Sequence, residues 1–127
     1  NTFMLSGEHT HDEIIRATDE GGIFIPSFGG GQVDHITGAF VFKAELSYLI
    51  ERGRITTPVV GVTLTDNCAT ILLNVDMVGN DSALDDGIGT CGKGGQGVPV
   101  GVGQPTIRLA GITVGGTTVE VSKREDA

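Results

Sequence analysis

Apolar residues recur at helical spacing over residues 68–78, at four positions: Ile71, Leu72, Val75 and Val78. Asp66 or Asn67 stands just before this run, where a short polar side chain can cap the first turn. Gly79 follows the run and ends the helix. The pattern therefore predicts a capped helix over residues 68–78.

A second short helix is predicted near the start of the chain, over residues 10–18. Thr10 and Glu13 have the spacing of a capping box, in which each side chain bonds the backbone of the other residue. Asp12 adds negative charge to the first turn, where the helix dipole favours it. Two consecutive glycines, at positions 21 and 22, then stop the helix.

Segments rich in β-forming residues surround the helices. Residues 22–28 predict a strand, and Pro26 within them indicates an edge or a bulge. The glycines of residues 28–33 predict a bend, or a place where something approaches the backbone closely. Residues 39–46 are again β-rich and predict a further strand.

Residues 47–65 predict a β-hairpin, with two β-rich arms on either side of a turn at Arg52 and Gly53. Pro58 and Gly61 fall within the second arm and indicate an irregularity there.

The second half of the chain is richer in glycine. Residues 79–87 predict an exposed acidic loop, and residues 89–105 hold so much glycine that they predict a loop as well. Residues 105–122 predict two final strands, separated either by a turn near Gly111 or by a break at residues 115–116.

These elements lack the repeated strand–helix–strand spacing of a doubly wound fold. Residues 1–127 therefore predict an α+β fold with a largely antiparallel β-sheet and two short helices. A chain of 127 residues can bury a modest core. Because aromatic residues make up only 5%, that core must consist mainly of aliphatic side chains.

Charge limits the partners. The net charge is −8, and the isoelectric point lies near 4.6. Such a chain is repelled by nucleic-acid phosphates and by anionic lipid surfaces, and no apolar run is long enough to span a membrane. We therefore expect neither nucleic acid nor a membrane as partner. With no visible signal peptide and only two cysteines, we expect reduced thiols and a cytoplasmic location.

Residues 87–94 come close to two phosphate-binding motifs. GIGTCG matches G-x-G-x-x-G, and the following Lys93 extends it toward a P-loop. However, Gly94 stands where a P-loop has a serine or threonine that holds magnesium, and the glycine-rich residues that follow cannot form the helix both motifs need. A nucleotide site is therefore rejected.

Cys91 is open to three interpretations. It can be a nucleophile, but the histidines that would activate it are distant in sequence. It can be a metal ligand, because a thiolate is a strong zinc donor. It can also be a small buried residue without chemistry. The neighbouring Lys93 and the surrounding backbone N–H groups would favour the thiolate form that the first two roles need.

The other candidate ligands have simpler interpretations. His9 and His11 can supply nitrogen to zinc, but their place at the start of the first helix favours solvated side chains. Cys68 lies among the apolar residues of the second helix, which favours a core thiol. The acidic residues of 79–87 lack the spacing of a calcium loop.

Five segments, taken in order, resemble the C-terminal region of the TldD/PmbA family, whose members are often labelled modulators of DNA gyrase. They are FGGGQVDHITGAFVF (28–42), YLIERGRITTPV (48–59), MVGND (77–81), GIGTCGKGGQGVPVGVGQP (87–105) and ITVGG (112–116). The resemblance covers nearly the whole chain, and the glycine-rich segment is similar to the TldD type.

The resemblance implies a zinc metallopeptidase that hydrolyses peptides or unfolded proteins. In TldD-type members two histidines of an HExxxH helix bind zinc, and a cysteine that corresponds to Cys91 is the third protein ligand. Gly92 and Lys93 would shape the substrate cleft beside it. PmbA-type members lack HExxxH and are partner subunits, so a homodimer or heterodimer is implied.

The sequence departs from that pattern because it contains no HExxxH. The family's proteins are several times longer, and the chain opens without methionine. We therefore expect residues 1–127 to be the C-terminal segment of a TldD-like protein, with no catalytic residue of its own and no activity alone. The alternative is a non-catalytic partner or structural module of a two-subunit protease.

Overall fold

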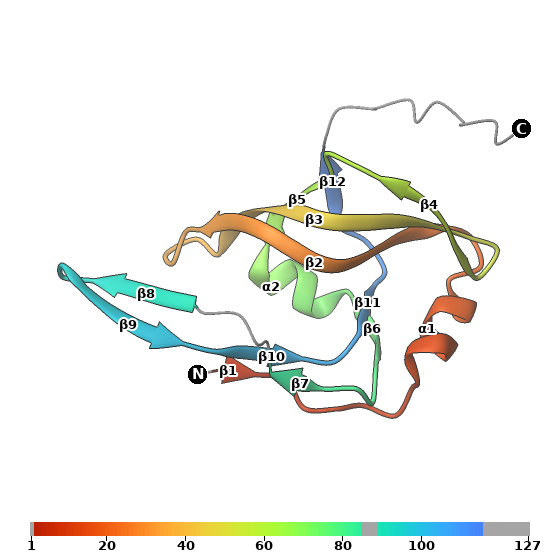
Figure 1. Ribbon diagram of the computed structural model, residues 1–127, viewed down its shortest axis with the longest axis horizontal. Helices are drawn as coiled ribbons and strands as arrows, with labels where there is room; N and C mark the ends of the chain where they lie inside the picture. The colour runs from red at the N-terminus through yellow and green to blue at the C-terminus, as the bar shows by residue number, and fades with distance from the viewer. Residues whose placement is uncertain (1, 85–88, 116–127) are drawn as a thin grey trace, which may run out of the picture. The chain divides into compact units, whose positions relative to one another are not determined.

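The computed structural model describes residues 2–84 and 89–115 (Figure 1). Residues 85–87 of the predicted acidic loop and the predicted strand beyond residue 115 lie outside this part. The chain forms two compact units. One consists of Asn1–Ile14 and Asp76–Arg108, and the other of Ile15–Val75 and Leu109–Ala127.

The second unit contains a five-stranded antiparallel sheet centred on one long strand, β3 (Ala39–Glu51). One side of β3 pairs with β2 (Gly22–Val33). The other side pairs first with β5 (Thr63–Asn67) and then with β4 (Arg54–Val59). Outside β5 lies β12 (Thr113–Gly115). The predicted α+β fold with a largely antiparallel sheet is confirmed.

β2 continues through residues 28–33, where the glycines predicted either a bend or a close approach to the backbone, and the close approach is found. The strand absorbs its irregularity as register shifts between Phe24 and Gly30, and these include the bulge predicted at Pro26. Gly31 shows the expected close approach. A Cβ atom there would overlap the carbonyl oxygen of Val41 and the ring of Phe42, so only glycine fits.

The predicted hairpin turn at Arg52 and Gly53 is confirmed. It connects β3 to β4, and both residues have positive φ, at 53° and 72°. A two-residue turn of this kind matches the right-handed twist of the strands it joins. The predicted irregularity of the second arm is also confirmed, because residues 60–62 separate β4 from β5.

The core of this unit lies against one face of the sheet. Phe40, Val62 and Leu64 are buried and form its centre. Partly buried side chains pack around them: Ile25, Phe42, Ala44, Val59, Cys68, Ile71 and Ile112. Two of the three central residues are aliphatic, but the rings of Phe40 and Phe42 lie next to one another in a tilted arrangement, with centroids 5.8 Å apart. The core is therefore less purely aliphatic than the composition predicts.

Helix α2 (Cys68–Leu73) is shorter than predicted. Of the two candidate caps, Asn67 is the one used, since its side chain accepts the N–H of Ala69. The helix ends at Asn74, and residues predicted to continue it form β6 (Val75–Val78). Valine at both ends of this stretch favours a strand, and pairing with β11 (Ile107–Leu109) overrides the helical spacing.

Helix α1 (His11–Ala17) confirms the first predicted helix. The hydroxyl of Thr10 accepts the N–H of Glu13 at 3.1 Å, as the capping box requires. The carboxylate of Glu13 returns a contact to the same hydroxyl at 3.2 Å. Ile14 and Ile15 are the buried residues of this helix.

The first unit holds a small three-stranded sheet of β1 (Thr2–Phe3), β10 (Val102–Gln104) and β7 (Ala83–Leu84). Backbone bonds such as Gly7 N–H to Gly79 O, 2.7 Å, hold residues 2–9 to the stretch around β6 and β7. At the other end of the chain, β11 and β12 are separated at residues 110–112, which confirms the predicted turn near Gly111.

Candidate functional site

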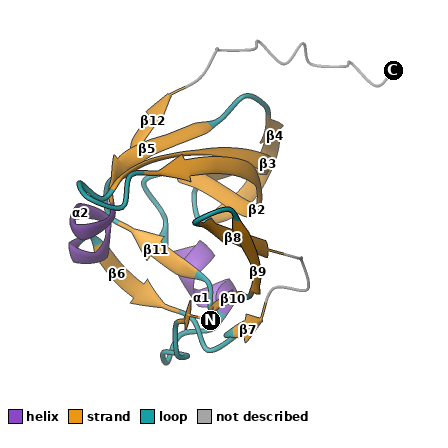
Figure 2. Cartoon of the chain, turned by 90° about the vertical axis from the view of Figure 1, so that its left-hand side faces the viewer, coloured by secondary structure: helices purple, strands orange, loops and turns teal. Residues whose placement is uncertain are grey.

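Cys91 lies in a β-hairpin, not in the predicted loop. β8 (Gly89–Lys93) pairs antiparallel with β9 (Gln96–Val100), and Figure 2 shows the two strands side by side. The register of this pair places Cys91 opposite Val98. Gly94 and Gly95 form the two-residue turn, with φ of 61° and 76°. The loop prediction is wrong because a Gly-Gly pair readily takes the positive φ that a tight hairpin turn needs.

The hairpin presents its cysteine to solvent. Cys91 is exposed and is a free cysteine, so the interpretation as a buried residue does not apply. Gly92 and Lys93 follow it along β8 and pair with Gly97 and Gln96. A Cβ atom on Gly92 would come no closer than 4.0 Å to its nearest neighbour, the Gln96 carbonyl oxygen. Packing therefore does not require glycine at position 92.

Cys68 behaves as predicted for a core thiol. It is partly buried at the start of α2 and packs against the cluster around Phe40. It is also a free cysteine.

The two histidines near α1 have polar partners of their own. His9 contacts the carboxylate of Glu13 at 3.5 Å, and His11 contacts the hydroxyl of Thr106 at 3.2 Å. The hydrogen bond with His9, followed by those with Thr10, lowers the pKa of Glu13 below its usual value. His9 fits the predicted capping-region role, whereas His11 is partly buried through its contact with Thr106.

Asp81 is a polar group that the sequence did not single out. Its carboxylate accepts both the backbone N–H and the hydroxyl of Thr106, at 2.8 and 2.7 Å. Partial burial raises the pKa of Asp81, but the hydrogen bonds from Thr106 outweigh that effect and leave it below its usual value. Part of the predicted acidic loop therefore has a structural role, because Asp81 holds Thr106 through two hydrogen bonds.

These groups do not assemble a metal site by themselves. Among residues 2–84 and 89–115, no three histidine, cysteine or acidic side chains are grouped so that they could hold a metal ion. A catalytic zinc needs about three protein ligands and one open position. The described residues therefore do not fit a complete zinc centre, and Cys91 offers at most one thiolate donor to it.

Comparison with known proteins decides the family. Residues 1–116 match the family described as the PmbA/TldA metallopeptidase C-terminal domain. The chain belongs to this family. The Metalloprotease TldD homolog of Haemophilus influenzae is 51% identical over 117 residues, which are 92% of this chain and 24% of that protein. The resemblance seen in the sequence is confirmed.

Two further proteins extend the comparison. The Zinc metalloprotease TldD homolog of Saccharolobus solfataricus is 28% identical over 116 residues, 91% of this chain and 25% of that protein. The crystal structure of TldE from Thermococcus kodakarensis has the same fold, with a TM-score of 0.72 at 16% identity, over 90% of this chain and 23% of that one.

The chain thus spans about a quarter of the length of the curated relatives it matches. It corresponds to a C-terminal domain of proteins named as metalloproteases. Among its described residues, no helix is long and apolar enough to cross a membrane.

Proposed function

We propose that residues 1–127 are the C-terminal segment of a zinc-dependent metallopeptidase that hydrolyses peptides or unfolded proteins in the cytoplasm. The observation that carries this proposal is the exposed free thiol of Cys91 on a hairpin of a metallopeptidase-family domain. Cys91 would be the cysteine ligand of the zinc, because a thiolate suits that ion. The name of the Saccharolobus relative supports zinc as the metal.

The remaining ligands and the catalytic base would have to come from outside this chain, whose sequence contains no HExxxH. For that reason we propose that the chain alone is inactive. Its own contribution would be to hold one donor in place. A tight hairpin suits that task, since the turn at Gly94 and Gly95 fixes the register of Cys91.

The chain would also supply part of the substrate cleft. Gly92 leaves open space next to Cys91, and Lys93 follows it in β8. Strand edges offer a second feature. In the described part of the chain, β2 pairs only with β3, so its other edge can accept an extended peptide through backbone bonds with little regard to sequence. Nucleic acid and membranes are disfavoured as partners by the net charge of −8.

A second candidate function is a non-catalytic partner or structural module in a dimeric protease. The lack of a three-ligand cluster among the described residues favours it, as does the fold shared with TldE. The 51% identity to a TldD homolog favours the first candidate. An HExxxH segment in the full-length protein that carries these residues would decide for the peptidase.

The zinc role is tested in that full-length protein by measuring bound zinc and peptidase activity after Cys91→Ser. We expect zinc to fall well below one equivalent and activity to be lost. Cys68→Ser is the matched control, because it removes the other thiol without touching the hairpin, and it should keep both. Equal zinc and equal activity in Cys91→Ser and the unmodified protein would refute the ligand role.

The inactivity of the chain alone needs its own test. Purified residues 1–127, supplied with zinc, are incubated with an unfolded protein substrate, and new amino termini are counted with and without a chelator. We expect no chelator-sensitive cleavage. Chelator-sensitive hydrolysis that survives repurification would show that the chain holds a complete site.

A further inference from the structure

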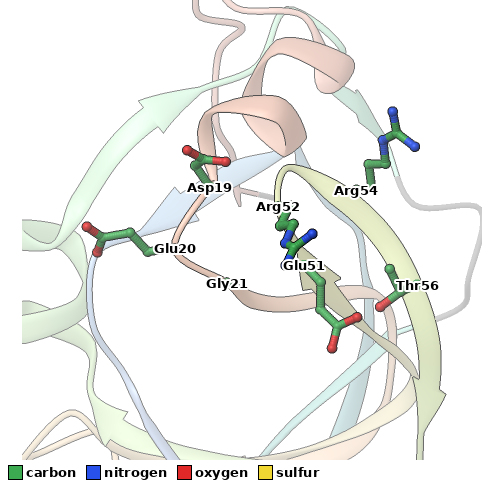
Figure 3. A pocket seen from close by; sticks show the side chains of 7 residues that line it. All are labelled: Asp19, Glu20, Gly21, Glu51, Arg52, Arg54 and Thr56. Atoms are coloured by element: carbon green, nitrogen blue, oxygen red, sulfur yellow. The ribbon is translucent and has the colours of Figure 1, made fainter.

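A groove of about 860 Å³ lies in the second unit, between the segment that follows α1 and the β3–β4 hairpin. Its volume falls within the range of small-molecule sites. Figure 3 shows its walls: Asp19, Glu20 and Gly21 belong to the segment after α1, and the other labelled residues belong to the hairpin. The lining residues are Asp19, Glu20, Gly21, Glu51, Arg52, Arg54 and Thr56.

Both signs of charge line this groove, and its two cationic groups come from one wall only. Two carboxylates, Asp19 and Glu20, stand on the first wall, and two guanidinium groups, Arg52 and Arg54, stand on the second together with Glu51. All five side chains belong to exposed residues. The ion pairs that the structure shows among its described residues join His9 with Glu13 and Arg108 with Asp76, so the charges of the groove remain available to a ligand.

Arg52 occupies a costly backbone conformation. Its φ is 53°, and among the described residues Arg52 is the one non-glycine residue with a positive φ. The first position of such a turn favours asparagine, aspartate or glycine, and a longer side chain there costs about 1–2 kcal/mol. Strain of this kind is a reason to look for a role of the side chain itself, and the side chain of Arg52 lines the groove.

The two walls are held against each other by close packing. Gly53, next to Arg52 in the turn, is buried against the last turn of α1. A Cβ atom on it would lie only 2.7 Å from the carbonyl oxygen of Arg16. The turn that carries Arg52 therefore sits at a fixed distance from the segment that carries Asp19. A groove with fixed walls loses little entropy when it binds a ligand.

We propose that this groove binds a small zwitterion, an amino acid or short peptide whose carboxylate lies against Arg52 and Arg54 and whose ammonium group lies against Asp19 and Glu20. Guanidinium groups bind carboxylates with paired hydrogen bonds, and carboxylates bind ammonium groups by charge. The site involves neither a metal nor bond cleavage, so it goes beyond the proposed peptidase function and does not rest on it.

The test is a titration of the ¹⁵N-labelled chain, followed through its backbone amide signals. Triglycine is the probe, because it carries one ammonium and one carboxylate and no side chain. We expect saturable shifts at Gly21, Arg52 and Arg54, with a Kd on the order of 1 mM. N-acetyl-triglycine lacks the cation and triglycinamide lacks the anion, and each should bind about two- to fivefold more weakly.

Two variants separate binding from folding. Arg52→Gly removes the side chain and relieves the backbone strain, so the fold should be kept or stabilised while triglycine binding weakens by at least about twofold. Lys43→Ala removes the same charge from an exposed position of β3 outside the groove and should bind normally. The proposal is overturned by unsaturable shifts, by capped tripeptides that bind as well as triglycine, or by equal effects of the two variants.

Discussion

The side-chain amide of Asn67 donates a hydrogen bond to the carbonyl oxygen of Thr37, with 2.6 Å between the nitrogen and the oxygen. The oxygen of the same amide accepts the N–H of Ala69 at 2.9 Å. Beside it, the N–H of Cys68 donates to the carbonyl oxygen of Gly38, also at 2.9 Å. One side chain thus caps α2 and ties it to the turn between β2 and β3.

Replacing Asn67 should therefore cost more than an ordinary helix cap. We expect Asn67→Ala to lower the free energy of unfolding by about 1–2 kcal/mol, because both bonds are lost. Asn67→Asp keeps the acceptor for Ala69 but not the donor for Thr37, and should lose less. Urea denaturation followed by circular dichroism measures both. Equal losses in the two variants would mean that the bond from Ala69 contributes nothing.

Two glycines with positive φ should differ sharply in their tolerance of a methyl group. Gly94, φ 61°, has open space around its missing Cβ, whereas Gly53, φ 72°, faces the carbonyl oxygen of Arg16 at 2.7 Å. Gly94→Ala should cost only backbone strain, about 1–2 kcal/mol. Gly53→Ala should lose about 1–3 kcal/mol more through overpacking. The denaturation midpoints of the two variants measure the difference. A lower midpoint for Gly94→Ala than for Gly53→Ala would contradict the prediction.

The ion pair of Asp76 and Arg108 should give the chain a pH-dependent contribution to stability. The Nε and Nη2 atoms of Arg108 donate to the two carboxylate oxygens at 2.8 and 2.9 Å. This hydrogen bonding lowers the pKa of Asp76 in the folded chain. A lowered folded-state pKa means that the contribution is complete above the unfolded value, near 3.9, and disappears as the pH falls through the folded value.

Asp76→Asn should thus lower the free energy of unfolding at pH 7 by up to about 1 kcal/mol, since the pair is partly exposed. The difference from the unmodified chain should close as the pH falls below the folded-state pKa. Glu45→Gln is a control at an exposed position of β3 and should show no such convergence. Thermal unfolding over a pH series tests the pattern, and a difference that stays constant down to low pH would contradict it.

The two thiols should react at very different rates in the folded chain. Cys91 is exposed on β8, and Cys68 is partly buried against the core. A neutral thiol reagent should modify Cys91 at least about tenfold faster than Cys68, because modification of the latter needs local opening. Single Cys→Ser variants assign the two phases, and in urea the rates should converge. Faster modification of Cys68 in the native chain would contradict the burial seen here.

Local chemistry explains which elements the sequence revealed. The capping box at Thr10 and Glu13 and the turn at Arg52 and Gly53 depend on neighbouring residues, so their spacing was sufficient to predict them. The predicted helix over residues 68–78 failed in its second half. There the spacing of apolar residues suits a helix, but pairing with β11, some thirty residues later in the chain, decides the outcome.

The features of the candidate site likewise fall into those that the sequence predicts and those that it does not. The thiol chemistry of Cys91 could be inferred from residue type, and its family resemblance from the order of motifs. Its position in a hairpin could not, because the Gly-Gly turn was hidden among other glycines. The charged groove was not visible either, since Asp19 and Arg52 belong to separate segments and meet only through packing at Gly53.

The interleaving of the two units affects the order in which the chain can fold during synthesis. β1 finds its partner only in β10, and residues 7–9 bond to residues 78–80. Residues 2–9 must therefore wait, without these partners, until residues 78–104 have also been synthesised. The strands β2 to β5, by contrast, pair with one another over shorter distances in sequence and can assemble early, before β12 adds to β5. A nascent chain stalled after α2 should already contain these four strands as a sheet, while residues 2–9 still lack their partners.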